Sequence, residues 1–468
     1  YGYDANGRLI SRSEPEGVSG WVYDTASGKG KGKLAESYFT PAGSSTPVYS
    51  EYYVYDGLGR SIQTAYGMDD QFYTLSFGYD DHGRPSQLTY PALGAAPGMA
   101  IRYEYDSNSI LQSVKDDLPA GITYWQANQQ DSRGRIIQET FGNSVTTNTS
   151  YDYATGLLTG INSSQAGILS VQNLQYQWEW KRARLQARRD ASLNLSDSFT
   201  YDALDRLKGV YFSSGTSQLT DYDAIGNITR LDGIGSYSYG TKPHAVTQAG
   251  SKLFAYDVNG NMTKRGGTVE NVFWSSFDLP VQINGASGEQ DTMRYGPDRS
   301  LYYRREQLSR PLNGSGPITS SSIEHYYVGG VFQHRITQGA AALDEYRHMI
   351  VANGRVVAQV NRKSGGAPEV YYFHRDHLGS LDVISNAAGQ VEAKLSFDAW
   401  GRRRNANTWS GVPSEGDLSR VRAITDLGYT GHRMLDASGT IHMNGRVYDP
   451  SIGRMLSAAP TIPDMWDG

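Results

Sequence analysis

The sequence predicts an all-β protein built from short strands and tight hairpins. Three observations carry this prediction. Its 468 residues include 34 Tyr, 8 Trp and 53 Gly, although only 38% are hydrophobic; Tyr and Trp suit half-buried pleated surfaces, and Gly suits tight turns. A short pattern built around Tyr-Asp recurs along the chain. No segment shows the long apolar period of 3.6 residues that an amphipathic helix needs.

The recurring pattern is an aromatic residue, a polar residue, Tyr, Asp, two variable residues, Gly, Arg or Asn, and an apolar residue. Its clear copies contain Asp4, Asp56, Asp80, Asp223 and Asp257, and its weaker copies contain Asp106, Asp131, Asp152, Asp202 and Asp398. Between Asp56 and Asp152 the steps are 24, 26, 25 and 21 residues. Such a spacing holds two strands and two turns and indicates a repeat array.

The residue types of the pattern predict a hairpin corner. Asp stands where a type I turn favours a side chain that caps its own backbone, and Gly stands where the chain takes a positive φ before the next strand. We therefore expect each repeat Asp to cap a turn rather than to catalyse a reaction. Aromatic residues two apart, such as Tyr103 and Tyr105, are expected on one face of a strand.

Other stretches also predict strands. Residues 174–181, "LQYQWEWK", alternate apolar or aromatic with polar residues, which is the period of a strand. Asn353-Gly354 lies between "HMIVA" and "RVVAQV" and is a strong two-residue hairpin signal. Hairpins of this kind cannot bury a face alone, so we expect them to pair side by side into an extended, curved sheet that can wrap around a space.

Composition argues against several classes of protein. A net charge of −5, from 43 basic and 48 acidic residues, does not favour nucleic acid as a partner. The absence of Cys excludes disulfides and thiolate metal sites. No run of about 18 apolar residues predicts a membrane span. The N-terminus has neither Met nor the pattern of a signal peptide, so we expect a soluble piece of a longer chain.

We expect neither a metal nor a cofactor. In "FHRDHLGS", His374 and His377 flank Asp376 but have no clear third partner elsewhere in the chain, so a turn is favoured over a metal site. The stretch "SGKGKGKL" lacks the spacing and the Ser or Thr of a phosphate-binding loop. Paired acids such as Asp69-Asp70 lack the alternating oxygen ligands of a calcium loop.

Taken together, these motifs resemble one known family. The Tyr-Asp repeats resemble the YD repeats of Rhs proteins. "FHRDHLGSLDVISNAAGQVEAKLSFDAWGRRR" resembles the start of the Rhs-associated core, and "LGYTGHRMLDASGTIHMNGRVYDPSIGRMLSAAP" resembles its end. The resemblance implies a YD-repeat β-ribbon that spirals into a shell, part of a hollow cage, over residues 1–324. Residues 325–468 would form the core, a C-terminal plug truncated before a second Asp-Pro-x-Gly motif.

The resemblance also implies a function. In polymorphic Rhs toxins and in the C components of insecticidal toxin complexes, the shell encapsulates a variable C-terminal toxin domain, and an aspartic autoprotease in the core releases it. The implied partners are the chain's own toxin domain beyond Gly468, an upstream shell segment or a partner shell chain, and secretion or toxin-complex machinery. The implied localisation is outside the producing cell, secreted or delivered by a secretion apparatus.

One residue departs from the family pattern. The protease signature begins with Asp-Pro after "GRxLS", but "GRMLSAAP" has Ala459 at the expected Asp. Such a protease needs one ionised and one protonated carboxylate, and Ala supplies neither. We therefore predict an inactive protease and, because the flanking motif is intact, favour an inactivating substitution. Asp449, Asp436 and Arg446 lie nearby in sequence; Asp449 and Arg446 are kept as candidate catalytic residues, although a structural role is favoured for all three.

Two alternatives remain open from the sequence. One is an extracellular adhesion or glycan-binding YD-repeat module, because exposed Tyr and Trp side chains can stack on sugars. The other is an intact protease, which would have to act despite Ala459. Asp464 and Asp467 could be substitutes for the missing carboxylate, although their spacing does not support that role.

Overall fold

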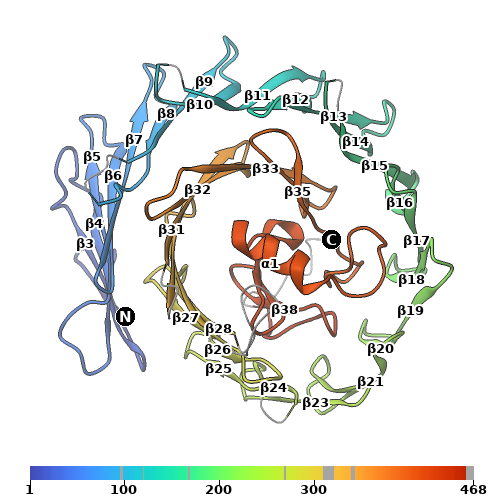
Figure 1. Ribbon diagram of the computed structural model, residues 1–468. Coiled ribbons are helices and arrows are strands. Elements are labelled where there is room, and N and C mark those ends of the chain that lie inside the picture. Colours follow the sequence, from blue (N-terminus) through green and yellow to red (C-terminus); the bar gives the residue numbers. More distant parts are fainter. Residues whose placement is uncertain are drawn as a thin grey trace.

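The computed structural model describes residues 1–94, 98–119, 121–166, 169–267, 270–308, 321–338 and 343–459. The described chain forms two large antiparallel sheets, a small third sheet and one α-helix, which confirms the all-β prediction. The first sheet winds around the outside as an outer ribbon, and the chain then turns inward into a second, inner arc (Figure 1). The inner arc in turn surrounds the helix and the small sheet, so the molecule is a spiral (Figure 1).

The outer sheet has 24 strands, and each strand pairs with the next strand in sequence. They are β1 (Gly2–Tyr3), β2 (Leu9–Glu14), β3 (Gly17–Tyr23), β4 (Leu34–Pro41), β5 (Tyr49–Tyr55), β6 (Ser61–Met68), β7 (Gln71–Tyr79), β8 (Pro85–Thr89), β9 (Ala100–Tyr105), β10 (Leu111–Asp116), β11 (Thr123–Gln130), β12 (Ile136–Phe141), β13 (Val145–Tyr151), β14 (Leu158–Gln165), β15 (Leu169–Glu179), β16 (Arg184–Asp190), β17 (Leu195–Tyr201), β18 (Leu207–Phe212), β19 (Ser217–Tyr222), β20 (Ile228–Leu231), β21 (Gly235–Tyr239), β22 (Val246–Ala249), β23 (Lys252–Tyr256) and β24 (Met262–Gly266).

The inner sheet has 11 strands, again paired in sequence order. They are β25 (Val272–Trp274), β26 (Pro280–Asn284), β27 (Gln290–Tyr295), β28 (Leu301–Leu308), β29 (Ser321–Val328), β30 (Phe332–Gln338), β31 (Leu343–Ala352), β32 (Arg355–Lys363), β33 (Glu369–Arg375), β34 (Leu381–Asn386) and β35 (Val391–Lys394). The change from outer to inner sheet thus falls between residues 266 and 272. The predicted boundary between residues 324 and 325 lies within β29, and the division into 1–324 and 325–468 stays a prediction.

The repeat corners confirm that the Asp residues cap turns. At Asp80, Oδ1 accepts hydrogen bonds from the backbone N–H groups of His82 (3.0 Å) and Arg84 (2.9 Å), and Oδ2 accepts one from Nε of Arg84 (2.7 Å). Gly83 has the expected positive φ of 79°. The same three contacts recur at Asp56, Asp131 and Asp202. Because a repeat contains two antiparallel strands, these corners share one edge of the ribbon.

The corners are also bonded to one another. The guanidinium carbon of Arg60 lies 4.5 Å from the ring centroid of Tyr79, the tyrosine of the next repeat. The hydroxyl of Tyr79 donates a hydrogen bond back to the carbonyl oxygen of Ser61 (2.8 Å). Equivalent contacts join further repeats through Arg84 and Tyr105, with the hydroxyl on Pro85, and through Arg206 and Tyr222, with the hydroxyl on Leu207. The repeat therefore encodes its own stacking onto the next repeat.

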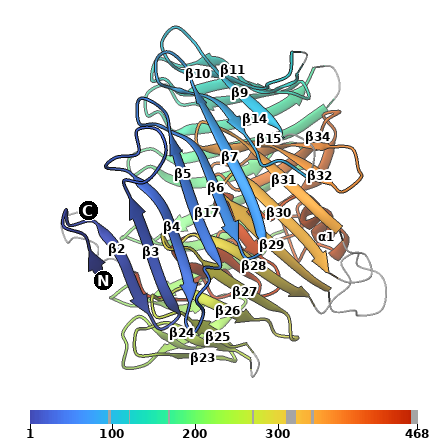
Figure 2. The same ribbon diagram turned by 90° about the vertical axis from the view of Figure 1, so that its left-hand side faces the viewer.

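The inner sheet packs against one part of the outer ribbon. β31 lies against β10, β32 against β11 and β34 against β15, and Figure 2 shows β30–β32 behind the strands of the outer wall. A single apolar core fills this interface. Its fully or almost fully buried members include Met68, Tyr90, Trp125 and Phe141 from the outer ribbon, and Phe332, Ile350, Ala358 and Tyr372 from the inner sheet.

Residues 396–459 lie inside the inner arc (Figure 1), and from here on the plug means this segment, which is shorter than the plug expected over residues 325–468. It contains α1 (Glu415–Ile424), the short 3-10 helix η1 (Tyr429–Gly431) and the strands β36 (Arg433–Leu435), β37 (Thr440–His442), β38 (Val447–Asp449) and β39 (Arg454–Met455). The helix was not predicted, because ten residues with only Val421 and Ile424 buried make a weak apolar stripe. Its signal was the N-terminal cap, in which Ser414 Oγ accepts from the N–H of Asp417 (3.1 Å).

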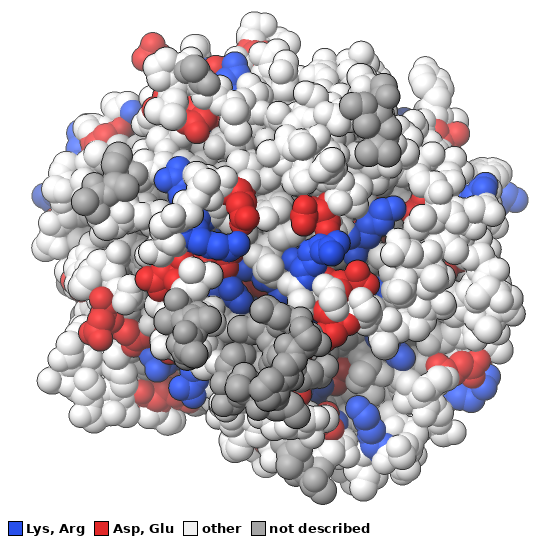
Figure 3. Space-filling model, viewed as in Figure 1, with Lys and Arg blue, Asp and Glu red and all other residues white. Residues whose placement is uncertain are grey.

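Charged side chains of both signs are interspersed on the end of the spiral seen in Figure 3. Within the described ranges, no helix has the length and apolar character needed to cross a bilayer.

Candidate functional site

The candidate site is the plug and the wall around it, because the plug contains Ala459, Asp449, Asp436 and Arg446, the described residues that the sequence associated with the protease motif. The inner sheet covers the plug on one side, and the outer strands β16–β21 face it directly on the other (Figure 1). On that second side, Arg404 of the plug is paired with Asp197 (2.8 Å), and the hydroxyl of Tyr237 donates to the carbonyl oxygen of Ile452 (3.0 Å). Both layers of the spiral therefore bind the plug.

The contact between the inner sheet and α1 is made by buried polar side chains. Glu345 on β31 is paired with Arg335 (3.0 Å) and Arg347 (3.2 Å). Arg347 also donates to the carbonyl oxygens of Arg422 (2.9 Å) and Ala423 (3.2 Å), in the last turn of α1. These carbonyls have no partner within the helix, and the helix dipole favours a positive charge there. The inner sheet thus caps the C-terminal end of α1.

A second contact is made at Asp426, just after α1. Its carboxylate accepts hydrogen bonds from Arg433 (2.8 Å) and from the hydroxyl of Tyr327 on β29 (3.0 Å). Burial alone would raise the pKa of Asp426, but Arg433, reinforced by more distant cations, holds that pKa well below its usual range. Asp426 is therefore an ionised, buried anchor between the plug and the inner sheet.

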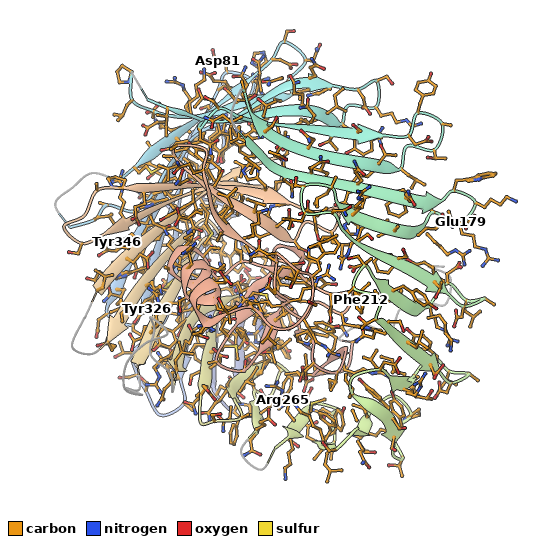
Figure 4. All side chains as sticks on the ribbon, turned by 45° about the vertical axis from the view of Figure 1, so that its right-hand side comes forward. Asp81, Glu179, Phe212, Arg265, Tyr326 and Tyr346 are labelled. Atoms are coloured by element: carbon orange, nitrogen blue, oxygen red, sulfur yellow. The ribbon has the colours of Figure 1, made fainter. Side chains whose placement is uncertain are left out.

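A third contact holds the backbone of the small sheet from two sides. Asp291 on β27 accepts a hydrogen bond from the N–H of Ser438 (3.0 Å) and is paired with the buried Arg304 (2.8 Å). Arg265 on β24 donates to the carbonyl oxygen of Ser438 (3.0 Å) and is paired with Asp449 (3.1 Å). Arg265 is labelled in Figure 4 near the end of the outer ribbon. The backbone N–H and C=O of one plug residue, Ser438, are thus bound by both large sheets.

The predicted site residue Asp449 lies at the end of β38 and is 1% exposed. Its Oδ2 faces Arg265, and its Oδ1 accepts a hydrogen bond from the N–H of Ser451 (2.8 Å). Both oxygens are therefore engaged within the fold. Asp436, the other nearby acid, is paired with Arg403 and Arg422.

Ala459 is exposed at the end of the last described segment. The carbonyl oxygen of Leu456 accepts a hydrogen bond from the N–H of Met262 (2.7 Å), and the side chain of Ala458 lies beside Gly260. The segment thus runs along the last Tyr-Asp corner of the outer ribbon. Asn261 of that corner donates to Asp278, which lies in the turn between β25 and β26 of the inner sheet (2.6 Å). Pro460, Asp464 and Asp467 lie outside the described residues.

Arg446 is half-buried in the turn between β37 and β38, where its carbonyl oxygen accepts a hydrogen bond from the N–H of Met443 (2.8 Å). In the part of the chain that the structure describes, no hydrogen bond or ion pair joins Ala459, Asp449 and Arg446 to one another. The roles suggested for these three residues stay predictions.

Sequence reasoning missed the buried ion pairs of the plug, above all Arg265, Arg304 and Asp426. For Arg304, the sequence did contain an indication that the residue is buried. In "LYYRREQL", Arg304 follows two tyrosines in the middle of a strand and points to the buried face. A charge at an inward position indicates a buried partner, but the partner itself lies too far away in sequence to be identified.

Comparison with known proteins finds distant relatives in sequence. No family model matches the chain. Among curated proteins, the tRNA3(Ser)-specific nuclease WapA of Bacillus spizizenii is 21% identical over 266 residues, which are 56% of this chain and 10% of that protein. The double-stranded DNA deaminase toxin A of Burkholderia cenocepacia is 26% identical over 94 residues, 20% of this chain and 6% of that protein. The chain thus spans about a tenth or less of these relatives.

Solved structures match over nearly the whole chain. The crystal structure of TcdB2-TccC3 has a TM-score of 0.75 at 17% identity, and the match covers 98% of this chain and 26% of that chain. A Photorhabdus luminescens Tc holotoxin pore with an aspartate-to-alanine mutation in TccC3 has the same TM-score at 16% identity, covering 98% and 25%. The chain therefore has an Rhs-type β-shell fold, as its motifs predicted. More particularly, it has the fold of part of the TcdB2-TccC3 toxin complex.

Proposed function

We propose that this chain is the closing end of a shell that encapsulates a C-terminal toxin domain, with residues 396–459 as its plug and with an autoprotease inactivated at Ala459. The observation that carries the proposal is the position of the plug inside the winding ribbon, bound there by ion pairs with the outer sheet and by hydrogen bonds with buried charged side chains of the inner sheet. Removing one partner of a buried ion pair typically costs 3–5 kcal/mol. A plug held in this way suits a permanent closure.

The proposed protease explains why the residue at position 459 matters. Ala459 follows a segment that runs beside the corner containing Asn261, where a hydrogen bond from Asn261 to Asp278 makes this part of the wall polar. A carboxylate at position 459 would restore one member of the acid–base pair that the family mechanism needs. The second member would be the aspartate of the Asp-Pro-x-Gly motif expected beyond Gly468.

Intact-mass spectrometry tests this part of the proposal. The protein extended to its natural C-terminus is compared with its Ala459→Asp variant and with Ala458→Asp, a control that adds the same charge one residue earlier. We expect only the Ala459→Asp protein to split into a shell and a C-terminal fragment. If all three proteins stay whole, the core is a structural cap and the inactivated-protease proposal fails.

The proposal also names partners. The shell would be completed by an upstream segment or a partner shell chain, would enclose the chain's own C-terminal toxin domain, and would leave the producing cell by secretion or through toxin-complex machinery. The fold shared with TcdB2-TccC3 supports this view. Electron microscopy of the extended protein should show an internal cavity, and a solid particle would contradict encapsulation.

The alternative of an adhesion or glycan-binding module draws no support from the repeat tyrosines. Tyr79, Tyr105 and Tyr222 each stack under an arginine and donate their hydroxyl to a carbonyl oxygen of the neighbouring hairpin. These rings are therefore used to join repeats.

A further inference from the structure

A row of histidines lies between the two layers of the spiral. Four histidines of the inner layer each contact an aromatic ring of the outer ribbon. The pairs and their ring-centroid distances are His334 with Tyr73 (6.0 Å), His348 with Tyr90 (5.2 Å), His374 with Phe141 (4.9 Å) and His377 with Tyr176 (4.7 Å). We call these four pairs the histidine seam. Figure 4 labels Tyr326 and Tyr346, two inner-sheet rings that also pack on His334.

His348 on β31 is fully buried in the seam. Its Nδ1 lies 3.1 Å from the carbonyl oxygen of Val360 and so carries the proton, whereas its Nε2 is buried without a partner among the described residues. The charged group that faces it is Arg362 on β32, and Tyr90 faces it from the outer ribbon. Burial, reinforced by Arg362, lowers the pKa of His348 to about 3. A second proton would have no acceptor.

His374 on β33 is 2% exposed and has a similar environment. Its Nε2 lies 2.8 Å from Oγ of Ser385, and its Nδ1 is buried without a described partner. The charged group that acts on it is Arg355 on β32, which is itself paired with Glu139 of the outer ribbon. Burial, again reinforced by an arginine, lowers the pKa of His374 to about 3.

The other two seam histidines, His377 and His334, each have a carboxylate nearby, unlike His348 and His374. Burial lowers the pKa of His377 to about 4, with Asp376 opposing the shift and Arg188 adding to it. Burial also lowers the pKa of His334, but Asp344, 3.6 Å from its Nε2, opposes that shift. His348 and His374 are therefore the seam members for which a positive charge is least compensated.

We propose that the histidine seam is an acid-sensitive joint: protonation of His348 and His374 separates the inner sheet from the strands of the outer ribbon that pack against it, while the plug stays bound. Each imidazolium would be a buried cation beside an arginine, which is costly in the closed seam. In a separated seam the same rings meet water and bind protons normally. This inference does not depend on a toxin cargo or on protease activity.

The direction and the pH window follow from the pKa values. A histidine whose pKa is lower in the closed state favours that state above its ordinary pKa of about 6.5 and loses this contribution as the pH falls. With a closed-state pKa of about 3, one histidine shifts the opening equilibrium by about 30-fold at pH 5, and two shift it by roughly 1,000-fold. Asp382 of β34, in the same contact between the sheets, opposes part of this shift, because burial raises its pKa to about 7 and its neutral form favours the closed state at pH 5. The carboxylates Asp426 and Glu345, whose pKa values are lowered, stay ionised in this window. The ion pair of Asp426 with Arg433 in the plug, and those of Glu345 in the inner sheet, thus persist while the seam opens.

A distance measurement across the seam tests the proposal. The chain has no Cys, so single cysteines placed at exposed Asp81, on the outer ribbon, and exposed Ala367, between β32 and β33, can carry two spin labels. Double electron–electron resonance on the full chain then compares pH 7.5 with pH 5. We expect longer, broader distances at pH 5 that reverse on return to pH 7.5. An unchanged distribution at pH 5 would overturn the proposal.

Histidine substitutions test whether the distance change at pH 5 comes from the histidine seam. In the labelled protein, His348→Gln together with His374→Gln should keep the pH 7.5 distances at pH 5, because glutamine stays neutral. The control His82→Gln changes an exposed histidine on an outer corner and should leave the response intact. If the double variant opens at pH 5 as the parent does, other groups drive the opening and the proposal fails.

A second measurement needs no substitution of the seam. Hydrogen exchange of the unmodified chain at pH 5, corrected for the intrinsic rate, should show β31–β33 losing protection before β36–β38 of the plug. His325 and His442, buried between the plug and the inner sheet, also have lowered pKa values and provide the competing route. If β36–β38 lose protection first, acid acts through that route and the seam proposal is overturned.

Discussion

Single residues shape this protein most clearly at the corners of the outer ribbon. In the corner that begins at Asp56, the chain turns through Gly57 and Gly59, but only Gly59 has a positive φ, at 81°. Asp56 binds the N–H groups of Leu58 and Arg60 and the side chain of Arg60. The two residues therefore have separate roles: the side chain of Asp56 caps the turn, and Gly59, with its positive φ, lets the chain reverse direction.

This division predicts different costs for two alanine substitutions in the same corner. Gly59→Ala should lower the free energy of unfolding by about 1 kcal/mol, because a side chain in the left-handed region strains the backbone. Gly57→Ala, the matched control, meets no atom within 4 Å and has no positive φ, so it should be neutral or stabilise slightly. Urea denaturation of both variants checks this. Equal midpoints would contradict the assignment.

At the scale of elements, the plug depends on contacts that join strands far apart in sequence. Strand β38 is tied to β24 through the pair of Asp449 and Arg265, and the turn at Ser438 is tied to β27 through Asp291. The helix α1 is held in the same way at its C-terminal end by Arg347 of β31. These three parts of the plug thus each bind a charged side chain of a surrounding sheet.

The ion pair of Asp449 with Arg265 leads to a prediction about the stability of the plug. Asp449→Asn should lower the free energy of unfolding by about 3–5 kcal/mol, because it leaves Arg265 buried without a counter-charge. The double variant Asp449→Leu with Arg265→Met should recover part of that loss, since it removes both charges. Thermal or urea unfolding compares the three proteins, with exposed Asp70→Asn as a control for removing a charge. A neutral Asp449→Asn would show that the pair does not hold the plug.

At the scale of the whole molecule, stability depends on the contact between the two layers. Asp382 on β34 lies in this contact, where Gln172 of β15 donates a hydrogen bond to it (2.6 Å). Burial raises the pKa of Asp382 to about 7, and Asp376 and Asp190 add to the shift while Gln172 opposes it. The layers therefore meet around a carboxylate that favours its neutral form.

Because the pKa of Asp382 is raised, we predict that the free energy of unfolding decreases at alkaline pH. A carboxyl group with a raised pKa stabilises the fold fully below its ordinary pKa, and that contribution is lost as the pH rises through about 7. We expect the urea midpoint of the parent to fall between pH 6 and pH 8.5, and Asp382→Asn to remove that fall because it stays neutral. Exposed Asp81→Asn is the control. A parallel fall in Asp382→Asn would exclude Asp382 as the cause.

The sequence by itself determined the local structure of this protein. The Tyr-Asp corners, the hairpin at Asn353-Gly354 and the strand that includes Leu174 follow from turn chemistry and from the two-residue period, which act between near neighbours. Its motifs also pointed to an Rhs-type shell, which the shared fold bears out. The helix α1 was missed because its apolar stripe is short and its stability comes from the surrounding sheets.

Only the tertiary structure decided which residues meet across the layers. The spiral brings Arg265 to Asp449, Arg347 to the end of α1, and His374 to Phe141, contacts that join positions from 75 to 233 residues apart. No local pattern encodes such pairs, because they depend on how far the ribbon curves before the chain turns inward. The curvature is the sum of many small strand twists, and only the folded chain reveals that sum.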